Sequence, residues 1–142
     1  MDLNMRVDSF VQLGKIFNDI GDSKSWGGYH LGVNETEFKE LENSIYTAKS
    51  HNGWFDEKNV RLAFKHLSLM LKEEELSKWV KSYNIDVNQN PKTIALIMAG
   101  NIPAVGFHDL LCSLLLNFDC LVKLSSDDKF IIPFIVKFLE SR

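Results

Sequence analysis

The sequence predicts an α/β protein in which a helical N-terminal region precedes an incomplete βαβα unit. Residues 1–90 are filled mostly by amphipathic patterns of helical length, whereas residues 91–142 contain two short apolar runs separated by a longer one. A strand, a helix and a strand in this order form a parallel pair, because the crossover between them is almost always right-handed. We therefore expect residues 1–142 to form a single, partial domain whose parallel sheet begins near residue 91.

Four helices are expected in the N-terminal region. Residues 5–20 place their apolar side chains mostly on one stripe, and Gly21 ends that pattern. Asn34 can cap a second helix and Asp56 a third, since short polar side chains accept hydrogen bonds from the first turn. A shorter helix follows a run of acidic residues. Residues 21–34 contain four of the chain's eight glycines and predict a mobile loop.

The strand–helix–strand segment places a site at one edge of the sheet. Residues 93–99 form an apolar run too short for a typical helix, as expected of a strand covered on both faces. Residues 107–118 predict the crossover helix and residues 120–124 the second strand. Parallel sheets bind ligands beyond the carboxyl ends of their strands, which here means residues 100–103 and 123–126.

A final helix is predicted after the second strand. Residues 125–128 offer capping groups, and Pro133 predicts a kink or a helix start near residue 132. Typical sheets have about 4–6 strands, so two strands leave this one unfinished. We expect either the N-terminal part of a longer protein, without its catalytic domain, or a piece that another chain completes. The apolar face that would then need a partner consists of Ile131, Phe134, Ile135, Phe138 and Leu139.

Composition excludes several classes of function. The net charge is −3 and the pI about 5.8, with no basic stripe, so we expect no nucleic-acid partner. No apolar run reaches the roughly 18 residues that cross a bilayer, and the N-terminus lacks the pattern of a signal peptide. Cys112 and Cys120 lie in apolar surroundings and predict two buried thiols in a reducing, cytoplasmic environment. The histidines lack metal-ligand spacing, so no metal site is expected.

The polar residues at the predicted sheet edge allow both a structural and a ligand-binding interpretation. Residues 100–103 (Gly-Asn-Ile-Pro) suit a tight turn, but their exposed N–H groups can also receive a phosphate or carbonyl oxygen. Lys123 is either an ordinary exposed lysine or a partner for a phosphate or ribose. Ser125 and Ser126 either cap a helix or contact a ligand.

Two further groups have mainly structural interpretations. His108, in the first turn of the predicted crossover helix, is expected to bond to the backbone. Trp54 and Phe55 are expected to pack on the core as a staple at the entry of a helix, although an exposed aromatic pair could touch a ligand or partner.

Taken together, these segments resemble the cofactor-binding half of the aldehyde dehydrogenase superfamily. There, a strand leads to a Trp-Asn-Phe-Pro turn, a helix, and a strand that ends in Lys-Pro-Ser-Glu. Here, the turn is Ala-Gly-Asn-Ile-Pro and the second strand ends in Lys-Leu-Ser-Ser. Most of the chain is similar to the N-terminal part of the acyl-CoA reductases of the LuxC type, through the segments VQLGKIF, NGWF, MAGNIPAVGFHDLLC and KLSSDDKFIIPF. The resemblance implies a Rossmann-like cofactor-binding domain of the aldehyde dehydrogenase type.

The resemblance also implies an activity. It is the reduction of a long-chain acyl-CoA to a fatty aldehyde by NADPH through a cysteine thioester. Asn101 would help to hold the developing oxyanion. Lys123 would meet the adenosine ribose or its 2′-phosphate, and Ser126 replaces a glutamate that often binds the ribose, which favours NADP over NAD. The cofactor-binding residues implied in this way are Met98, Ala99, Gly100, Asn101, Ile102, Lys123, Ser125 and Ser126.

One departure from the superfamily limits the expected activity. The nucleophilic cysteine of the superfamily lies well downstream, and neither Cys112 nor Cys120 matches it. We therefore expect the 142-residue chain to be inactive alone. The full-length protein would be a homo-oligomer, and acyl-transferring and acyl-activating enzymes could be its partners. The alternatives are a non-catalytic binding module that retains part of the nucleotide cleft, and a superfamily reductase that acts on acyl phosphates.

Overall fold

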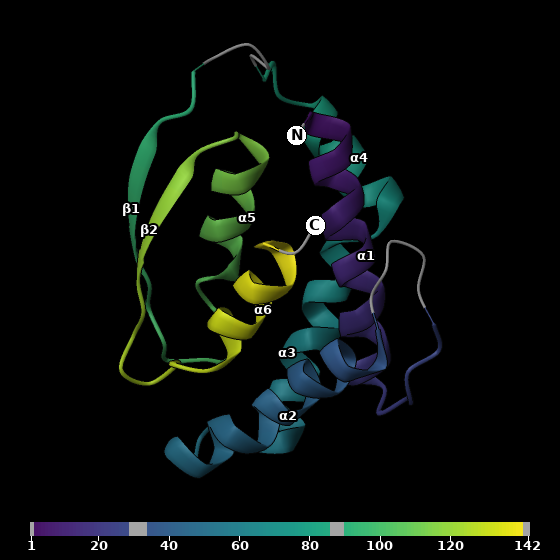
Figure 1. Cartoon of the computed structure of the whole chain (residues 1–142), viewed down its shortest axis with the longest axis vertical. Coiled ribbons are helices and arrows are strands. Elements are labelled where there is room, and N and C mark those ends of the chain that lie inside the picture. The colour runs from purple at the N-terminus through teal and green to yellow at the C-terminus, as the bar shows by residue number, and fades with distance from the viewer. Residues whose placement is uncertain (1, 29–33, 86–89, 141–142) are drawn as a thin grey trace.

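The computed structural model describes residues 2–28, 34–85 and 90–140 and shows a mixed α/β protein that is mostly helical (Figure 1). Parts of the predicted loop at 21–34 and of the linker before the first strand fall outside these residues. The elements are, in order, α1 (Leu3–Gly21), α2 (Glu35–His51), α3 (Glu57–Met70), α4 (Glu73–Lys81), β1 (Thr93–Ile97), α5 (Phe107–Leu115), β2 (Asp119–Lys123) and α6 (Ile131–Glu140).

The helix starts follow the capping signals in the sequence. The Asn34 side chain accepts a hydrogen bond from the Glu37 N–H at 2.9 Å, and the Glu37 carboxylate accepts one from the Asn34 N–H, which completes a capping box. Asp56 caps α3 in the predicted way. Helix α6 begins at Ile131, so Pro133 lies in its first turn, where a missing N–H leaves no intrahelical bond unmade. The predicted helix start near residue 132 is confirmed.

The core joins the helical region to the crossover helix. The ring of Phe17 on α1 stacks on that of Phe64 on α3, with centroids 4.8 Å apart, and Phe107 at the start of α5 meets Phe17 edge-on at 5.7 Å. Helices α1 and α3 approach closely at Gly14, where an added Cβ would lie 2.6 Å from the Cβ of Leu71. The helices and the strand unit therefore share one hydrophobic core.

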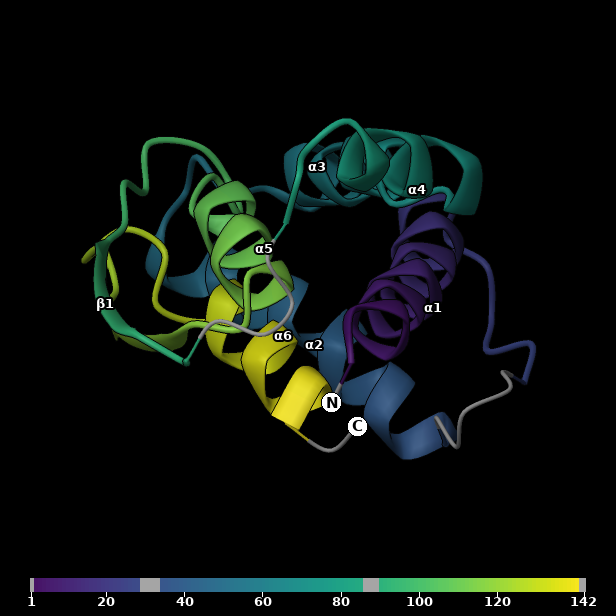
Figure 2. The same cartoon turned by 90° about the horizontal axis from the view of Figure 1, so that it is seen from above.

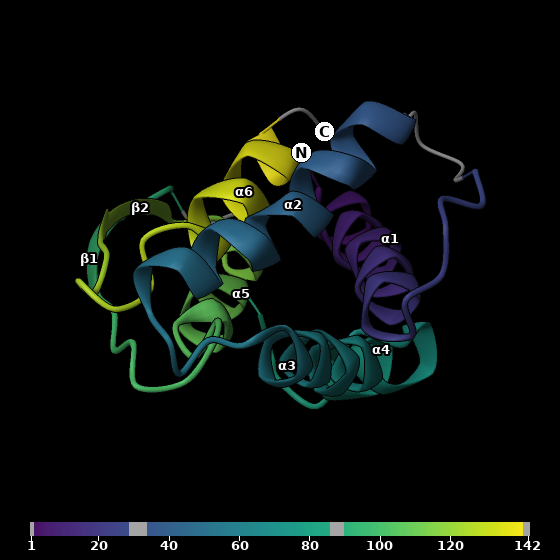
Figure 3. The ribbon, with the colours of Figure 1, turned by 90° about the horizontal axis from the view of Figure 1, so that it is seen from below.

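The two strands form a parallel pair that is covered on one face. Thr93 pairs with Asp119 and Ile97 with Lys123, while α5 and α6 lie to one side of the pair (Figures 2 and 3). Among the described residues no helix covers the other face, where Ile97 is 79% exposed and Leu121 is 66% exposed. The prediction of a first strand buried on both faces is therefore wrong, because alternate side chains of the apolar run point to solvent.

The apolar face of α6 is covered by the chain itself. Ile131, Ile135 and Phe138 are buried, and α2 packs beside α6 (Figure 3). Lys137 of α6 also pairs with Glu40 of α2 at 2.7 Å. The expectation that this face needs another chain is wrong, because a helix distant in sequence supplies the cover. Large exposed apolar side chains lie instead on the open face of the sheet, at Ile97 and Leu121, and singly elsewhere.

Candidate functional site

The pairing of β1 with β2 brings the two predicted site segments together. The Met98 N–H donates to the Lys123 carbonyl at 3.0 Å, immediately after the last pair of the ladder. Two residues further along each segment, Gly100 lies against Ser125, whose hydroxyl would collide with any Cβ at position 100. Both segments thus meet at the carboxyl edge of the sheet, where ligands of parallel α/β proteins bind.

The site residues differ in what they can offer a ligand. Ala99, Asn101, Ile102, Lys123 and Ser126 are exposed, so their polar atoms and backbone can be reached from solvent. The remaining three are less accessible. Gly100 and the side chain of Met98 are buried, Met98 packing against Gly106, and the half-buried Ser125 accepts a hydrogen bond from the Asp127 N–H at 3.2 Å.

Asp128 fixes the turn after β1 to the start of α6. One of its carboxylate oxygens accepts from the Ala104 N–H at 2.8 Å and the other from the Ile131 N–H at 3.4 Å. Ala104 has a positive φ of 56°, a conformation that non-glycine residues rarely adopt, and the bond to Asp128 holds it there. Burial raises the pKa of Asp128, and the two N–H groups act in the opposite direction. The sequence predicted a capping role at residues 125–128 but not this clamp.

A turn of the helical region also reaches this edge. The Asn52 amide donates to the carbonyl of Asp127 at 3.3 Å, and its oxygen accepts from the Trp54 N–H at 3.0 Å. Phe55 is buried, as the predicted staple requires, whereas Trp54 is 84% exposed, so the staple prediction is wrong for Trp54. The two halves of the chain therefore meet beside the candidate site.

The two cysteines are half-buried rather than buried as predicted. The Cys112 sulfur lies 3.7 Å from Nδ1 of His108, and that ring lies 6.0 Å from the ring of Trp79. His108 is exposed. Its ring faces the Cys112 thiol, whereas the expected hydrogen bond was to the backbone. Burial raises the pKa of the Cys112 thiol, and the negative charge of Asp109 raises it further. Burial likewise raises the pKa of Cys120. Neither thiol has the lowered pKa of an activated nucleophile.

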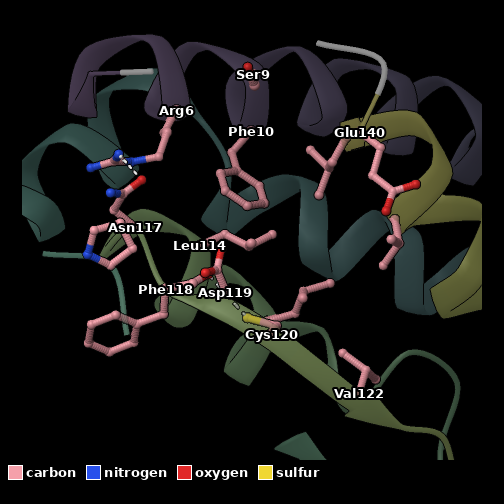
Figure 4. A pocket seen from close by; sticks show the side chains of 14 residues that line it. Arg6, Ser9, Phe10, Leu114, Asn117, Phe118, Asp119, Cys120, Val122 and Glu140 are labelled. Atoms are coloured by element: carbon pink, nitrogen blue, oxygen red, sulfur yellow. Dashed lines mark hydrogen bonds between the residues drawn. The ribbon is translucent and has the colours of Figure 1, made fainter. Parts of the chain in front are cut away.

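A separate hollow of about 400 Å³ lies at the amino end of β2, away from the candidate site (Figure 4). Arg6 of α1 donates to the Asn117 side-chain oxygen at 2.9 Å beside it. Apolar side chains line the hollow together with the charged groups Arg6, Asp119 and Glu140. Because two acids face one arginine there, the hollow does not define a class of ligand.

Comparison with protein-family models, with curated proteins and with solved structures found no match. Within the described residues, no three His, Cys, Asp or Glu side chains gather as metal ligands. In the same part of the chain, no helix has the length and apolar character needed to cross a membrane.

Proposed function

We propose that this chain supplies the adenosine-phosphate half of the NADPH site of a long-chain acyl-CoA reductase, within a Rossmann-like domain. The observation that carries the proposal is the contact between the 100–103 turn and the 123–126 segment, made by Gly100 against Ser125 just after the Met98–Lys123 hydrogen bond. The 100–103 turn ends 20 positions before Lys123, and the two segments meet at the edge that would bind the cofactor.

The exposed groups at this edge fit a phosphorylated ribose. Lys123 offers a cation to a 2′-phosphate, and Ser126 offers a hydroxyl where a carboxylate would repel that phosphate. Helix α5 begins just after the turn without a side-chain cap, but Gly106 and Phe107 at its start are buried and the Phe107 N–H donates to the Ala104 carbonyl, so the helix end does not add to the site. Gly100 is a poorer fit, because Ser125 occupies the space beside it; Asn101 and Ile102 are the more accessible part of the turn.

The catalytic part of the proposal is confined to Asn101. Bound NADPH would supply a hydride, and the exposed Asn101 amide can donate a hydrogen bond to an oxyanion that develops on the acyl carbon. The raised pKa values of Cys112 and Cys120 do not suit either thiol to form the acyl thioester. We expect the 142-residue chain to bind the cofactor without reducing acyl-CoA.

Calorimetric titration of the chain with NADPH and NADH tests the proposal. We expect NADPH to bind about tenfold more tightly, corresponding to roughly 1.4 kcal/mol from one ion pair to the 2′-phosphate. Lys123→Ala should abolish this preference, whereas the matched control Lys58→Ala, at an exposed position on α3, should preserve it. Equal affinity for the two cofactors, or no binding of either, would contradict the proposal.

A non-catalytic interaction module is the second candidate function. It is favoured by the uncovered face of the sheet, where Ile97 and Leu121 are largely exposed, because exposed apolar side chains of this size mark contact surfaces when they cluster. Self-association without nucleotide binding would support this alternative. A superfamily reductase of acyl phosphates is less well supported, since it would not share the matches at Trp54-Phe55 and at residues 107–109.

A further inference from the structure

Among residues 2–28, 34–85 and 90–140, the outer edge of β2 has no neighbouring strand to pair with its backbone groups. Met98 donates to the Lys123 carbonyl and Asp119 donates to the Lys92 carbonyl, so the backbones of Asp119 and Lys123 face β1. Hydrogen-bonding direction alternates along a strand, so Leu121 also faces β1, while Cys120 and Val122 direct their N–H and C=O groups away from it. The described sheet contains β1 and β2 alone, so this edge is open.

The side chains of β2 are self-complementary under a twofold rotation. The five residues are Asp-Cys-Leu-Val-Lys, with an acid at one end and a base at the other. If a second β2 lies antiparallel and is centred on Leu121, each Asp119 faces Lys123 of the partner subunit. Leu121 then faces the partner's Leu121 on the same exposed face. A shift of two residues in either direction removes both charge pairs, so a single register is selected.

The backbone geometry suits the same register. Because Leu121 directs its N–H and C=O to β1, the two copies of Leu121 form a non-hydrogen-bonded pair, in which side chains lie closest. Cys120 and the partner's Val122 then form a hydrogen-bonded pair on each side of the axis. Side-chain charge, apolar contact and backbone direction thus agree on one arrangement.

We propose that the chain forms a twofold-symmetric dimer in which the β2 edges pair antiparallel about Leu121, so that two half-sheets join into one four-stranded sheet. The outer edge of β1 does not offer the same match, because Thr93–Ile97 carries no charge. The contact is therefore isologous and closes at two copies. The β2 edge shares Lys123 with the proposed cofactor site, but the pairing of the strands does not require bound cofactor.

The contact is small. A five-residue edge buries less than a standard interface, so the dimer should be weak and in rapid exchange with the monomer. We expect sedimentation velocity between about 10 µM and about 1 mM, the range of weak complexes, to show a species approaching twice the 16.3 kDa of the chain. A chain that stays monomeric over this whole range overturns the proposal.

Charge exchange tests the register. D119K places two bases opposite each other, and K123D places two acids opposite each other, so each variant alone should dimerise at least about tenfold more weakly. An equimolar mixture of D119K and K123D should form a heterodimer, because every pair across the axis is again opposite in charge. The double variant D119K/K123D should regain the wild-type dimer.

The behaviour of the D119K and K123D variants shows whether the β2 edge, and not another surface, forms the dimer. Both positions are exposed, so each variant should retain the wild-type far-UV circular dichroism and thermal unfolding midpoint. Single variants that dimerise as tightly as the wild type, or a mixture that does not associate, would show that β2 edges do not pair. Because D119K leaves Lys123 intact, NADPH binding by that variant reports separately on the proposed function.

Discussion

The helical region and the strand region of this chain differ in how completely their own residues supply hydrogen-bond partners and cover for apolar side chains. Helices α1–α4 make their backbone hydrogen bonds internally, and side chains of Asp2, Asn34 and Asp56 cap three of them. They bury their apolar side chains against each other and against α5 and α6. Within the part of the chain that the structure describes, the two strands share one ladder and leave two edges and one face open, with Leu121 largely exposed. A helix closes its own hydrogen bonds, whereas a strand depends on neighbours. The open edges and face of the sheet are therefore where the proposed contact between two copies lies.

Truncation of a core aromatic should show this contrast most strongly. Phe64→Ala removes the ring that stacks on Phe17 and leaves a cavity between α1 and α3, so we expect the free energy of unfolding to fall by about 3–5 kcal/mol. Leu121→Ala, on the open face, should change it by less than about 0.5 kcal/mol for the monomer. Urea denaturation of dilute protein measures both. Comparable losses in the two variants would show that the open face is covered in solution.

Removal of the Asp128 carboxylate should have the next largest effect. In Asp128→Ala the N–H groups of Ala104 and Ile131 lose their acceptors, and we expect a loss of about 2 kcal/mol. Asp127→Ala, at an exposed neighbouring position, is the matched control. The variant should also lose NADPH binding if the 100–103 turn needs the clamp. A stable variant that retains the wild-type unfolding midpoint would show that the clamp does not hold the turn.

The same carboxylate makes a pH prediction of defined sign. Because the native pKa of Asp128 lies above its usual 3.8, the native state binds more protons than the unfolded state between these two values. This group therefore contributes a stability that falls as pH rises through that window. The free energy of unfolding of the wild type, relative to that of Asp128→Asn, should therefore fall as pH rises across the window. A difference that stays constant with pH would contradict the raised pKa.

Local signals in the sequence predicted the helices well, because a helix start is encoded within four residues. Asn34 with Glu37 and Asp56 with its following turn are such cases. The failures are non-local. Nothing in the apolar run of β1 says which face will be covered, and the cover of α6 comes from α2, nearly a hundred residues earlier. The Asp128 clamp on Ala104 spans 24 residues in the same way.

The candidate site was predictable in position but not in accessibility. Parallel pairing was enough to bring Gly100 and Ser125 to one edge, because the ends of adjacent parallel strands are neighbours. That the serine fills the space beside the glycine depends on the path of the chain after β2, which no local pattern encodes. The exposure of Trp54 beside the buried Phe55 depends in the same way on the fold of the turn.

Close helix packing gives a smaller and more local test of the helical region. In Gly14→Ala the new Cβ lies 2.6 Å from the Leu71 Cβ, so α1 and α3 must move apart. Overpacking of this kind opposes the gain in helix propensity, and we expect a net loss of about 1–2 kcal/mol. Gly53→Ala has open space around the new methyl group and is the matched control. Unchanged thermal unfolding of Gly14→Ala would mean that the two helices are less tightly joined than the structure shows.

The smallest expected effect concerns an exposed ion pair between the same two helices. The Lys65 ammonium, 2.7 Å from an Asp22 oxygen, lowers the pKa of that carboxyl; partial desolvation opposes this, and Lys24 adds to the lowering. The unfolded state therefore binds more protons between the native pKa and 3.8, so the pair stabilises the protein above 3.8 and ceases to do so as pH falls through the native pKa. Asp22→Asn should lower the thermal unfolding midpoint slightly at neutral pH and low salt. That difference should vanish in acid and shrink in high salt, because exposed pairs are screened.

Asp8→Asn, at an exposed position on α1, should show no such dependence. If the two variants behave alike, the link between α1 and α3 rests on the packing of Gly14 and Phe17 and not on charge.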